Sequence, residues 1–368
     1  MKLTCDRTEL AEAVGFATTV VPTRSTRQIL QDVRIQAEGG VVEVLATDLE
    51  VGVRVRVEKA DVARDGAGLF PAGKTTSVLR ELAGDKVEVG NEDGVSIVDG
   101  DGSQFRFAVE DAGEFPAVPR FQDGPDDAFS LDRAALERLI RKTAFAAATE
   151  GTRYALNGVL FDIQDGRLRL VATDGKRLAK VDRPLADPGA PGKVYAVVPT
   201  KGVMALARLA SSDEETVKLR FLPGQLHAAG ERASLSAQLV QGRFPPYEEV
   251  IPRGHEKRVF FDTGVLLAGL RRAALVTTKD SQGVKLSFAY NKLTLASRAP
   301  ELGEAKVELP VEYPYDPLEA TFNPQLLVDA LKAIDAGTVK IELKESTTAA
   351  LLEEEGGLLY VVMPINQA

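Results

Sequence analysis

The sequence has 368 residues and a hydrophobic fraction of 44%, which predict two or three globular domains. Its net charge of −9 disfavours a nucleic-acid partner unless basic residues gather on one face. The single cysteine, Cys5, excludes an intrachain disulfide and a cysteine metal cluster, and two distant histidines, His227 and His255, disfavour histidine metal sites and Ser–His or Cys–His catalysis. Because the chain has no run of about 18 apolar residues and no secretory N-terminus, we expect a cytoplasmic protein without a membrane partner. We also expect no metal or other cofactor.

The first third of the chain predicts helices and strands in a fixed order. Asp6 predicts a helix start, because an N-cap aspartate accepts hydrogen bonds from free amides of the first turn. Apolar residues at Val41–Leu45 predict a strand leading into Ala46-Thr-Asp48. Pro71 predicts a second helix, since proline at the first helical position loses no hydrogen bond. A charged strand with alternating apolar residues follows at Val87–Val89.

The same order of signals occurs twice more, so the sequence predicts a threefold repeat. The corresponding helix starts lie 126 and 130 residues apart for aspartate, and 128 and 125 residues apart for proline. The second repeat contains Asp132, Leu168–Val171 before Ala172-Thr-Asp174, Pro199 and Val217–Leu219, and the third contains Asp262, Leu293–Leu295 before Ala296-Ser297, Pro324 and Val339–Ile341.

Two Phe-Pro pairs, Phe115–Pro116 and Phe244–Pro245, fall near the ends of the first two repeats. Proline breaks a strand and favours an extended link, so we expect domains at 1–124, 125–252 and 253–368. Each would have two helices and about eight short strands. The predicted fold class is therefore α+β, with three tandem similar domains that each place two helices on one face of antiparallel sheets.

Positive charge is concentrated on the predicted helices. In the helix after Asp132, Arg138, Arg141 and Lys142 lie opposite the apolar stripe at 100° per residue, although for one helix alone a solvated face is the simpler interpretation. Across six helices we count twelve basic and five acidic residues, in a chain with 45 and 54 overall. The basic residues are Arg7, Lys74, Arg80, Arg133, Arg138, Arg141, Lys142, Lys201, Arg208, Arg271, Arg272 and Lys332; the acidic ones are Glu9, Glu12, Glu81, Glu137 and Asp329.

A ring with these helices facing inward would need more than one chain. Six helices about 10 Å apart would leave a hole of roughly 10 Å, too narrow for duplex DNA, whose major groove alone is about 12 Å wide. Twelve helices would leave roughly 28 Å. If the protein encircles DNA, the geometry therefore predicts a two-fold dimer, the commonest symmetric assembly.

Six stretches of the chain, in this order, resemble the beta subunit of bacterial DNA polymerase III, the sliding clamp, along nearly its whole length. They are Val21–Thr26 with Ile29–Leu30, Ala46–Leu49, Thr152–Gly158, Ala172–Ala179, Gly242–Pro252 and Tyr360–Pro364. The resemblance implies the DNA clamp fold and a head-to-tail homodimeric ring of six domains with twelve helices around duplex DNA. It implies a non-catalytic role that confers processivity on the replicative polymerase.

The resemblance also implies three sets of site residues. A cleft between the second and third domains would bind short linear peptides of the DNA polymerase III alpha subunit, the clamp loader and repair polymerases; its residues would be Leu156, Thr173, Gly175, Lys176, Arg177, Leu178, Pro245, Val250, Val361, Val362, Met363, Pro364 and Ile365. We expect one of Val361 and Val362 to be buried in the final strand. DNA contacts, from the resemblance and the basic helix face, would be Arg24, Lys74, Arg138, Arg141, Lys142, Arg153, Tyr154 and Lys201. The dimer interface would pair Phe105 with Leu275 and Val276.

Three positions depart from the family pattern and leave peptide preference open. Lys176 stands where many relatives carry histidine, and Glu249 stands where some carry arginine. The chain ends in Asn366-Gln-Ala368 rather than in a basic and apolar finish.

Three other functions remain open from the sequence. Gly68–Thr75 fits the phosphate-binding pattern G-x-x-x-x-G-K-[ST], but Pro71 removes a backbone amide from that loop and the preceding Ala63–Ala67 is not a buried strand. A repeat scaffold could bind peptides without DNA. Asp48 and Asp174 could act as hydrolase carboxylates, but they are more simply explained as turn residues.

Overall fold

The computed structural model describes residues 1–121, 128–149, 154–185, 187, 190–210, 215–278 and 282–365. The chain folds into two compact units, each described here by itself. Unit 1 comprises Met1–Glu137, Asp187–Pro191 and Val198–Leu239, and unit 2 comprises Arg138–Ala186, Gly192–Val197 and Val240–Ala368. Within the described residues, none of the helices has the length and apolar character needed to span a bilayer.

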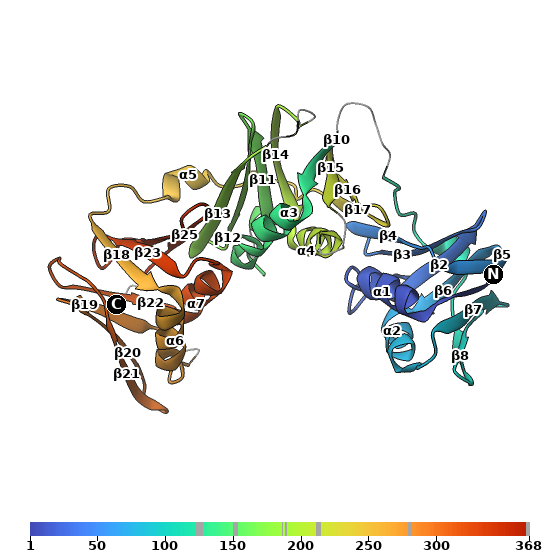
Figure 1. The fold of residues 1–368 in the computed structure, drawn as a ribbon, viewed down its shortest axis with the longest axis horizontal. Helices are drawn as coiled ribbons and strands as arrows, with labels where there is room; N and C mark the ends of the chain where they lie inside the picture. Colours follow the sequence, from blue (N-terminus) through green and yellow to red (C-terminus); the bar gives the residue numbers. More distant parts are fainter. Residues whose placement is uncertain are drawn as a thin grey trace. The chain divides into compact units, whose positions relative to one another are not determined.

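Unit 1 contains two antiparallel sheets, ordered β5-β1-β7-β8-β9 and β10-β15-β16-β17-β4-β3-β2-β6 (Figure 1). Helices α1 and α2 pack against each other, and α1 also contacts β3 and β4. The elements are β1 (Lys2–Asp6), α1 (Arg7–Thr18), η1 (Gln28–Gln31), β2 (Asp32–Glu38), β3 (Val41–Thr47), β4 (Val51–Val57), β5 (Ala60–Arg64), β6 (Gly66–Pro71), α2 (Ala72–Glu81), β7 (Lys86–Glu92), β8 (Val95–Gly100), β9 (Ser103–Ala108), η2 (Ala112–Glu114), β10 (Ala128–Asp132), α4 (Thr200–Leu209), β15 (Thr216–Leu222), β16 (Gln225–Ala229) and β17 (Ala233–Gln238).

Unit 2 also contains two antiparallel sheets, ordered β14-β11-β12-β13-β25-β24-β23-β18 and β21-β20-β19-β22. Helix α3 (Arg133–Arg141) and strand β14 (Lys193–Pro199) contain residues of both units. The other elements are η3 (Ala144–Ala146), η4 (Tyr154–Leu156), β11 (Gly158–Gln164), β12 (Arg167–Thr173), β13 (Arg177–Pro184), α5 (Tyr247–Val250), β18 (Lys257–Asp262), α6 (Thr263–Ala274), β19 (Val284–Ala289), β20 (Lys292–Ala299), β21 (Gly303–Pro310), β22 (Leu318–Phe322), α7 (Pro324–Ala333), β23 (Thr338–Leu343), β24 (Ala350–Glu353) and β25 (Leu358–Val362).

The three aspartate helix starts are confirmed. The Oδ1 atoms of Asp6, Asp132 and Asp262 accept hydrogen bonds from the backbone amides three residues later, at 2.9, 2.7 and 2.8 Å. The proline signals differ in detail. Pro324 is the first residue of α7, but Pro71 and Pro199 end strands β6 and β14 and occupy the N-cap position. Proline suits both places because neither requires an amide donor.

Two of the sheets pass from one predicted domain to the next. Strand β17 pairs with β4, so Leu235 lies opposite Val53, and strand β13 pairs with β25, so Leu178 lies opposite Val361. The Phe-Pro segments are anchored as well as extended: Phe115 is 4% exposed and Phe244 is 1% exposed, each within an apolar cluster. These backbone pairings explain why the compact units do not coincide with the three sequence repeats.

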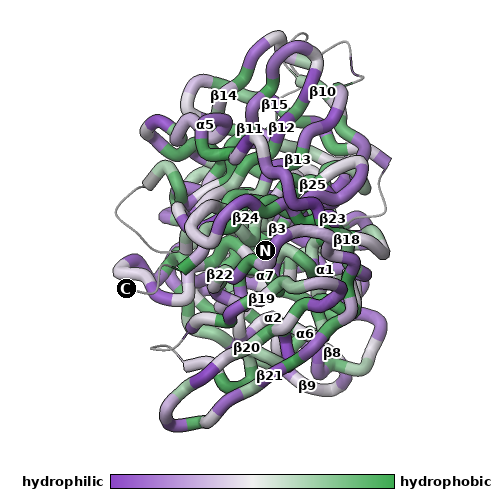
Figure 2. The backbone as a smooth tube through the Cα atoms, turned by 90° about the vertical axis from the view of Figure 1, so that its left-hand side faces the viewer, coloured by the Kyte–Doolittle hydropathy of each residue, from purple (hydrophilic) through white to green (hydrophobic). Residues whose placement is uncertain are grey.

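The sheets follow the polar and apolar alternation of their sequences. Hydrophilic and hydrophobic residues alternate along β20 and β21 in Figure 2. On β20, Leu293 and Leu295 are fully buried, whereas Arg298 is exposed. Since successive side chains of a strand point to opposite faces, one face of this sheet covers the core and contacts α6, and the other faces solvent.

Candidate functional site

The predicted cleft residues meet around a tight turn and a strand pair in unit 2. In the turn between β12 and β13, the Thr173 hydroxyl donates to the Arg177 carbonyl (2.6 Å) and accepts from the Gly175 amide (3.1 Å). Gly175 has φ +87°, a left-handed conformation that glycine adopts without strain. Past the end of β25, the Met363 amide donates to the Lys176 carbonyl at 2.9 Å, so the chain leaves β25 beside this turn.

The floor of the cleft is one apolar cluster. Leu156, Leu178 and Val361 are 7%, 2% and 4% exposed and pack together with Phe244 and Tyr247. The prediction that Val362 lines the cleft is wrong. Both valines of the final strand are buried, and Val362 (0% exposed) points to the opposite face of the strand from Val361. Val362 therefore supports the strand from its other side and does not line the apolar floor.

The remaining cleft residues form a more exposed rim. Val250 is 57% exposed, Met363 49% and Ile365 37%, and large apolar side chains at such exposure offer area for a ligand to bury. Gly175 and Lys176 are exposed, whereas Pro245 and Pro364 are half-buried. The site thus combines a buried apolar floor with flexible or apolar rim side chains.

Arg177 is engaged in internal contacts. Its guanidinium donates to Asp174 Oδ2 (3.0 Å), Asp329 Oδ2 (2.8 Å) and the Phe145 carbonyl (2.6 Å), and lies 5.5 Å from the centre of the Phe145 ring. Burial alone lowers the pKa of Arg177, but the hydrogen bond to Asp329, the nearby Tyr360 hydroxyl and the Asp174 charge raise it overall. Arg177 therefore holds the turn against helix α7.

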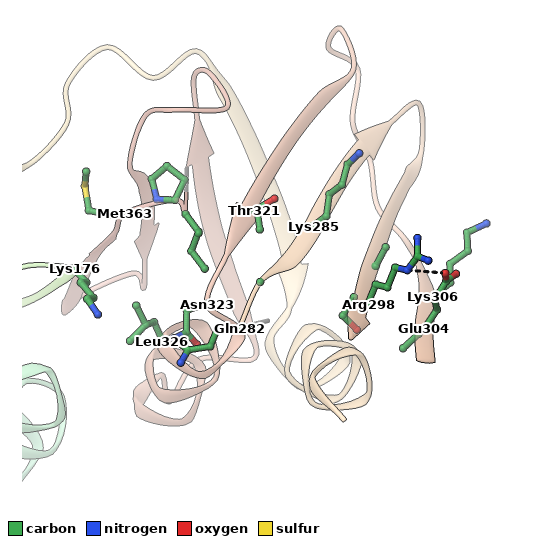
Figure 3. A pocket seen from close by; sticks show the side chains of 16 residues that line it. Lys176, Gln282, Lys285, Arg298, Glu304, Lys306, Thr321, Asn323, Leu326 and Met363 are labelled. Carbon is green, nitrogen blue, oxygen red and sulfur yellow. Dashed lines mark hydrogen bonds and ion pairs between the residues drawn. The ribbon is translucent and has the colours of Figure 1, made fainter. Parts of the chain in front are cut away.

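A cavity beside the cleft is lined by residues that the sequence did not indicate. A cavity of about 980 Å³ is lined by Lys176, Met363, Pro364 and Ile365 of the cleft (Figure 3). It is also lined by residues in or next to β19–β22 and α7 that the repeat pattern did not single out: Gln282, Gly283, Lys285, Ala296, Ser297, Arg298, Glu304, Ala305, Lys306, Thr321, Asn323 and Leu326. The alternation of β19–β21 places Lys285, Arg298 and Lys306 on the solvent face, but only the register brings them together.

The predicted DNA contacts divide into free and engaged side chains. Arg24, Lys74 and Arg138 are exposed, and no ion pair joins them to another residue in the part of the chain that the structure describes. Arg141 donates twice to Asp335, at 2.7 and 2.8 Å, and its side chain remains 43% exposed. Arg153 and the side chain of Tyr154 lie outside the described residues.

The prediction that Lys142 contacts DNA requires correction, whereas that for Lys201 does not. Lys142 is 4% exposed, and its Nζ atom contacts Glu354 and, at 3.1 Å, Asp335, so it is not a residue of a solvated basic face. Helix α3 ends at Arg141, one residue before Lys142, so helical periodicity does not hold there. Lys201 forms an ion pair with Asp48, but its side chain remains 34% exposed, so its contact with DNA stays a prediction.

The rival motifs have structural explanations. In Gly68–Thr75, residues up to Pro71 belong to strand β6, which pairs with β2, and the hydroxyl-bearing Thr75 is fully buried. The Asn91 side chain lies 2.6 Å from where a Cβ of Gly68 would stand, so close packing requires this glycine. The segment forms no loop that could surround phosphates.

Asp48 and Asp174 close equivalent turns. Asp48 Oδ1 accepts from the Glu50 and Val51 amides, and Asp174 Oδ1 from the amides of the corresponding residues two and three positions later. Each second carboxylate oxygen binds a cation, Lys201 or Arg177. Among the described residues, no cluster of histidine, cysteine and carboxylate could hold a metal ion.

The predicted dimer residues belong to an edge strand of unit 1 and to the end of a helix in unit 2. Phe105 belongs to β9, the edge strand of the five-stranded sheet, and is half-buried. Leu275 follows helix α6 and is 78% exposed, and Val276 is half-buried. An edge strand presents unpaired backbone groups that can pair with another chain, and an exposed leucine can be buried against that chain.

Comparison with known proteins covers the whole chain. Residues 1–119, 130–246 and 248–366 match the N-terminal, central and C-terminal domains of the DNA polymerase III beta subunit. The beta sliding clamps of Pseudomonas aeruginosa and Caulobacter vibrioides are both 33% identical to this chain, with 100% of each chain covered.

Solved structures agree with this result. The DNA polymerase III beta subunit of Pseudomonas aeruginosa has a TM-score of 0.88 at 33% identity, and that of Thermotoga maritima 0.92 at 26%, each with 100% of both chains covered. The Caulobacter crescentus beta sliding clamp, solved with PEG bound to a proposed beta-motif tethering region, has a TM-score of 0.89 at 32% identity over 100% of both chains. The chain therefore belongs to the DNA polymerase III beta subunit family, the beta sliding clamps, which are non-catalytic processivity factors of DNA replication.

Proposed function

We propose that two copies of this chain close head to tail into a ring around duplex DNA in the cytoplasm, with clamp domains at 1–124, 125–252 and 253–368. Strand β9 is at one edge of the five-stranded sheet and β21 at one edge of the four-stranded sheet, and neither has a second neighbouring strand among the described residues. Backbone pairing of such edges, with Phe105 packing against Leu275 and Val276, would bury the exposed leucine. Membership of the clamp family supports the ring.

The DNA contacts of this ring would be made to phosphates. Arg24, Lys74 and Arg138 are the exposed candidates whose charge is not offset by a described carboxylate. We expect Arg153 and Tyr154 to join them, and Arg141 to contribute only weakly because Asp335 already binds it. Phosphate contacts of this kind carry no sequence information and permit sliding. The exposure of these unpaired cations is the observation that carries the DNA assignment.

The cleft of unit 2 would bind short linear peptides of the polymerase III alpha subunit, the clamp loader and repair polymerases. Leu156, Leu178 and Val361 supply the apolar floor, and Met363 can adapt its shape to different ligands. The PEG-bound tethering region of the Caulobacter crescentus clamp supports a ligand site of this kind.

Retention on closed circular DNA tests the ring. The protein, loaded by its clamp loader, should stay on a closed circle and leave when the circle is linearised, whereas a peptide-binding scaffold would not respond to DNA topology. A triple variant Arg24→Ala, Lys74→Ala, Arg138→Ala should be retained less and show a weaker salt dependence. The matched control is Lys292→Ala, an exposed lysine of β20. Unchanged retention of the triple variant would contradict the DNA-lining assignment.

A further inference from the structure

A row of residues crosses the solvent face of the sheet formed by β19–β22. Lys285 lies opposite Thr321 on one side and Ala296 on the other, and Ala296 lies opposite Lys306. Arg298 and Glu304 form the next cross-strand pair on the same face. With strands about 4.8 Å apart, the four-strand row spans about 14 Å, enough for about four extended peptide residues.

This row is continuous with the rim of the peptide cleft. At its β22 end, the Ile365 amide donates to the Thr321 carbonyl at 2.7 Å, which fixes the last described residues against the sheet. Lys176, Met363 and Ile365 line the same cavity as Lys285 and Lys306 (Figure 3). A peptide that leaves the cleft in this direction would therefore meet the row.

The charge of the cavity is opposite to that of the chain. Among the described residues, its lining contains the cations Lys176, Lys285, Arg298 and Lys306 and the single carboxylate of Glu304, although the chain carries a net charge of −9. Ala296 and Gly283 leave the space between the long side chains open. The described side chains that line the cavity thus carry more positive than negative charge, although Glu319 and Glu308 lie close to two of the cations.

The cations are available to a ligand. Lys285 pairs with Glu319 (2.6 Å), Arg298 with Glu304 (3.3 Å) and Lys306 with Glu308 (2.9 Å), and all six side chains are 45–79% exposed. Such surface pairs hold their partners weakly, so a ligand carboxylate can compete for the same cations. No ion pair with another described residue involves Lys176.

We propose that this basic groove binds acidic residues that flank the apolar segment of a partner peptide, an inference that rests on the cleft being the peptide site proposed above. Carboxylates of an extended segment would lie across the row from Lys176 towards Lys306, and the amides of Gln282 and Asn323 would supply further hydrogen bonds. The row lies on a face of the sheet and leaves the edge of β21 available for pairing with a second copy. Partners with acidic flanks would thus bind in preference to those with neutral flanks.

Fluorescence anisotropy on the intact protein tests this preference. The probes are three labelled peptides that share the clamp-binding segment of the polymerase III alpha subunit. One carries Glu residues before the segment, one carries Glu residues after it, and one carries Gln residues at both ends. One acidic peptide should bind about tenfold more tightly than the Gln peptide at about 50 mM salt, and the advantage should shrink at about 500 mM.

Variants locate the effect. Lys285→Gln, Arg298→Gln, Lys306→Gln together should remove the acidic advantage and leave the Gln peptide's affinity unchanged, whereas Lys292→Gln, on the same face but outside the cavity, should retain it. Equal binding of all three peptides, or an advantage that survives in the triple variant, would overturn the groove and leave the cleft standing. If none of the peptides binds, the cleft assignment fails and the groove with it.

Discussion

Replacing Lys142 with alanine would remove a buried cation from a cluster of two carboxylates. The Lys142 side chain is 5% exposed, as is that of Glu354, which its Nζ atom contacts. Glu354 also accepts hydrogen bonds from the Asp335 and Ala336 amides at 2.8 and 2.9 Å, directly after helix α7. Lys142 therefore links the end of helix α3 to the end of helix α7.

The expected cost follows from the charge left behind. Removing one partner of a buried ion pair destabilises a protein by about 3–5 kcal/mol, because the other charge loses its compensation. Because the two backbone amides still stabilise the Glu354 carboxylate, we expect Lys142→Ala to lower the free energy of unfolding by about 3 kcal/mol, the lower end of this range. The double variant Lys142→Met, Glu354→Gln should recover most of this loss, since neither charge then remains.

Urea unfolding followed by circular dichroism measures the effect. Arg138→Ala is the matched control, because Arg138 is an exposed residue of the same helix and should change the free energy of unfolding by less than about 0.5 kcal/mol. Folded Lys142→Ala should still be retained on circular DNA, whereas Arg138→Ala should reduce retention. A Lys142→Ala protein that is as stable as the parent but leaves DNA faster would refute the structural role.

Three further predictions concern stability and partner binding. Burial and the Glu110 charge raise the pKa of Asp32 to about 6, so at pH 7 the folded chain holds an ionised carboxylate in a place where ionisation costs free energy that the unfolded chain does not lose. Asp32→Asn should therefore raise the free energy of urea unfolding by about 2 kcal/mol at pH 7 and leave it unchanged near pH 4; no pH dependence would contradict this. Leu49 has φ +81°, a left-handed conformation that is strained for leucine but not for glycine. Leu49→Gly should therefore raise the free energy of unfolding by about 1 kcal/mol, and Gly175→Leu should lower it by a similar amount, both measured from urea midpoints. Deleting Met363–Ala368 should abolish polymerase stimulation in primer-extension assays while the protein remains a dimer in solution; full stimulation would refute the cleft assignment.

The sequence determined the repeated architecture because its signals are local. An N-cap aspartate bonds an amide three residues away, and strand alternation is a property of consecutive residues, so Asp6, Asp132 and Asp262 marked helices without knowledge of the fold. The Asp48 and Asp174 turns are local in the same sense, which is why the sequence could explain them as turn residues.

Only the tertiary structure decided which charges are free. The partner of Lys142 lies 212 residues away and that of Lys201 lies 153 residues away, so neither pairing leaves a periodic signal in the sequence. The basic groove also depends on the register that places Lys285, Ala296 and Lys306 in one row. A helical wheel or a strand pattern gives the face on which a charge lies, but the distance to its partner is set by how distant segments pack.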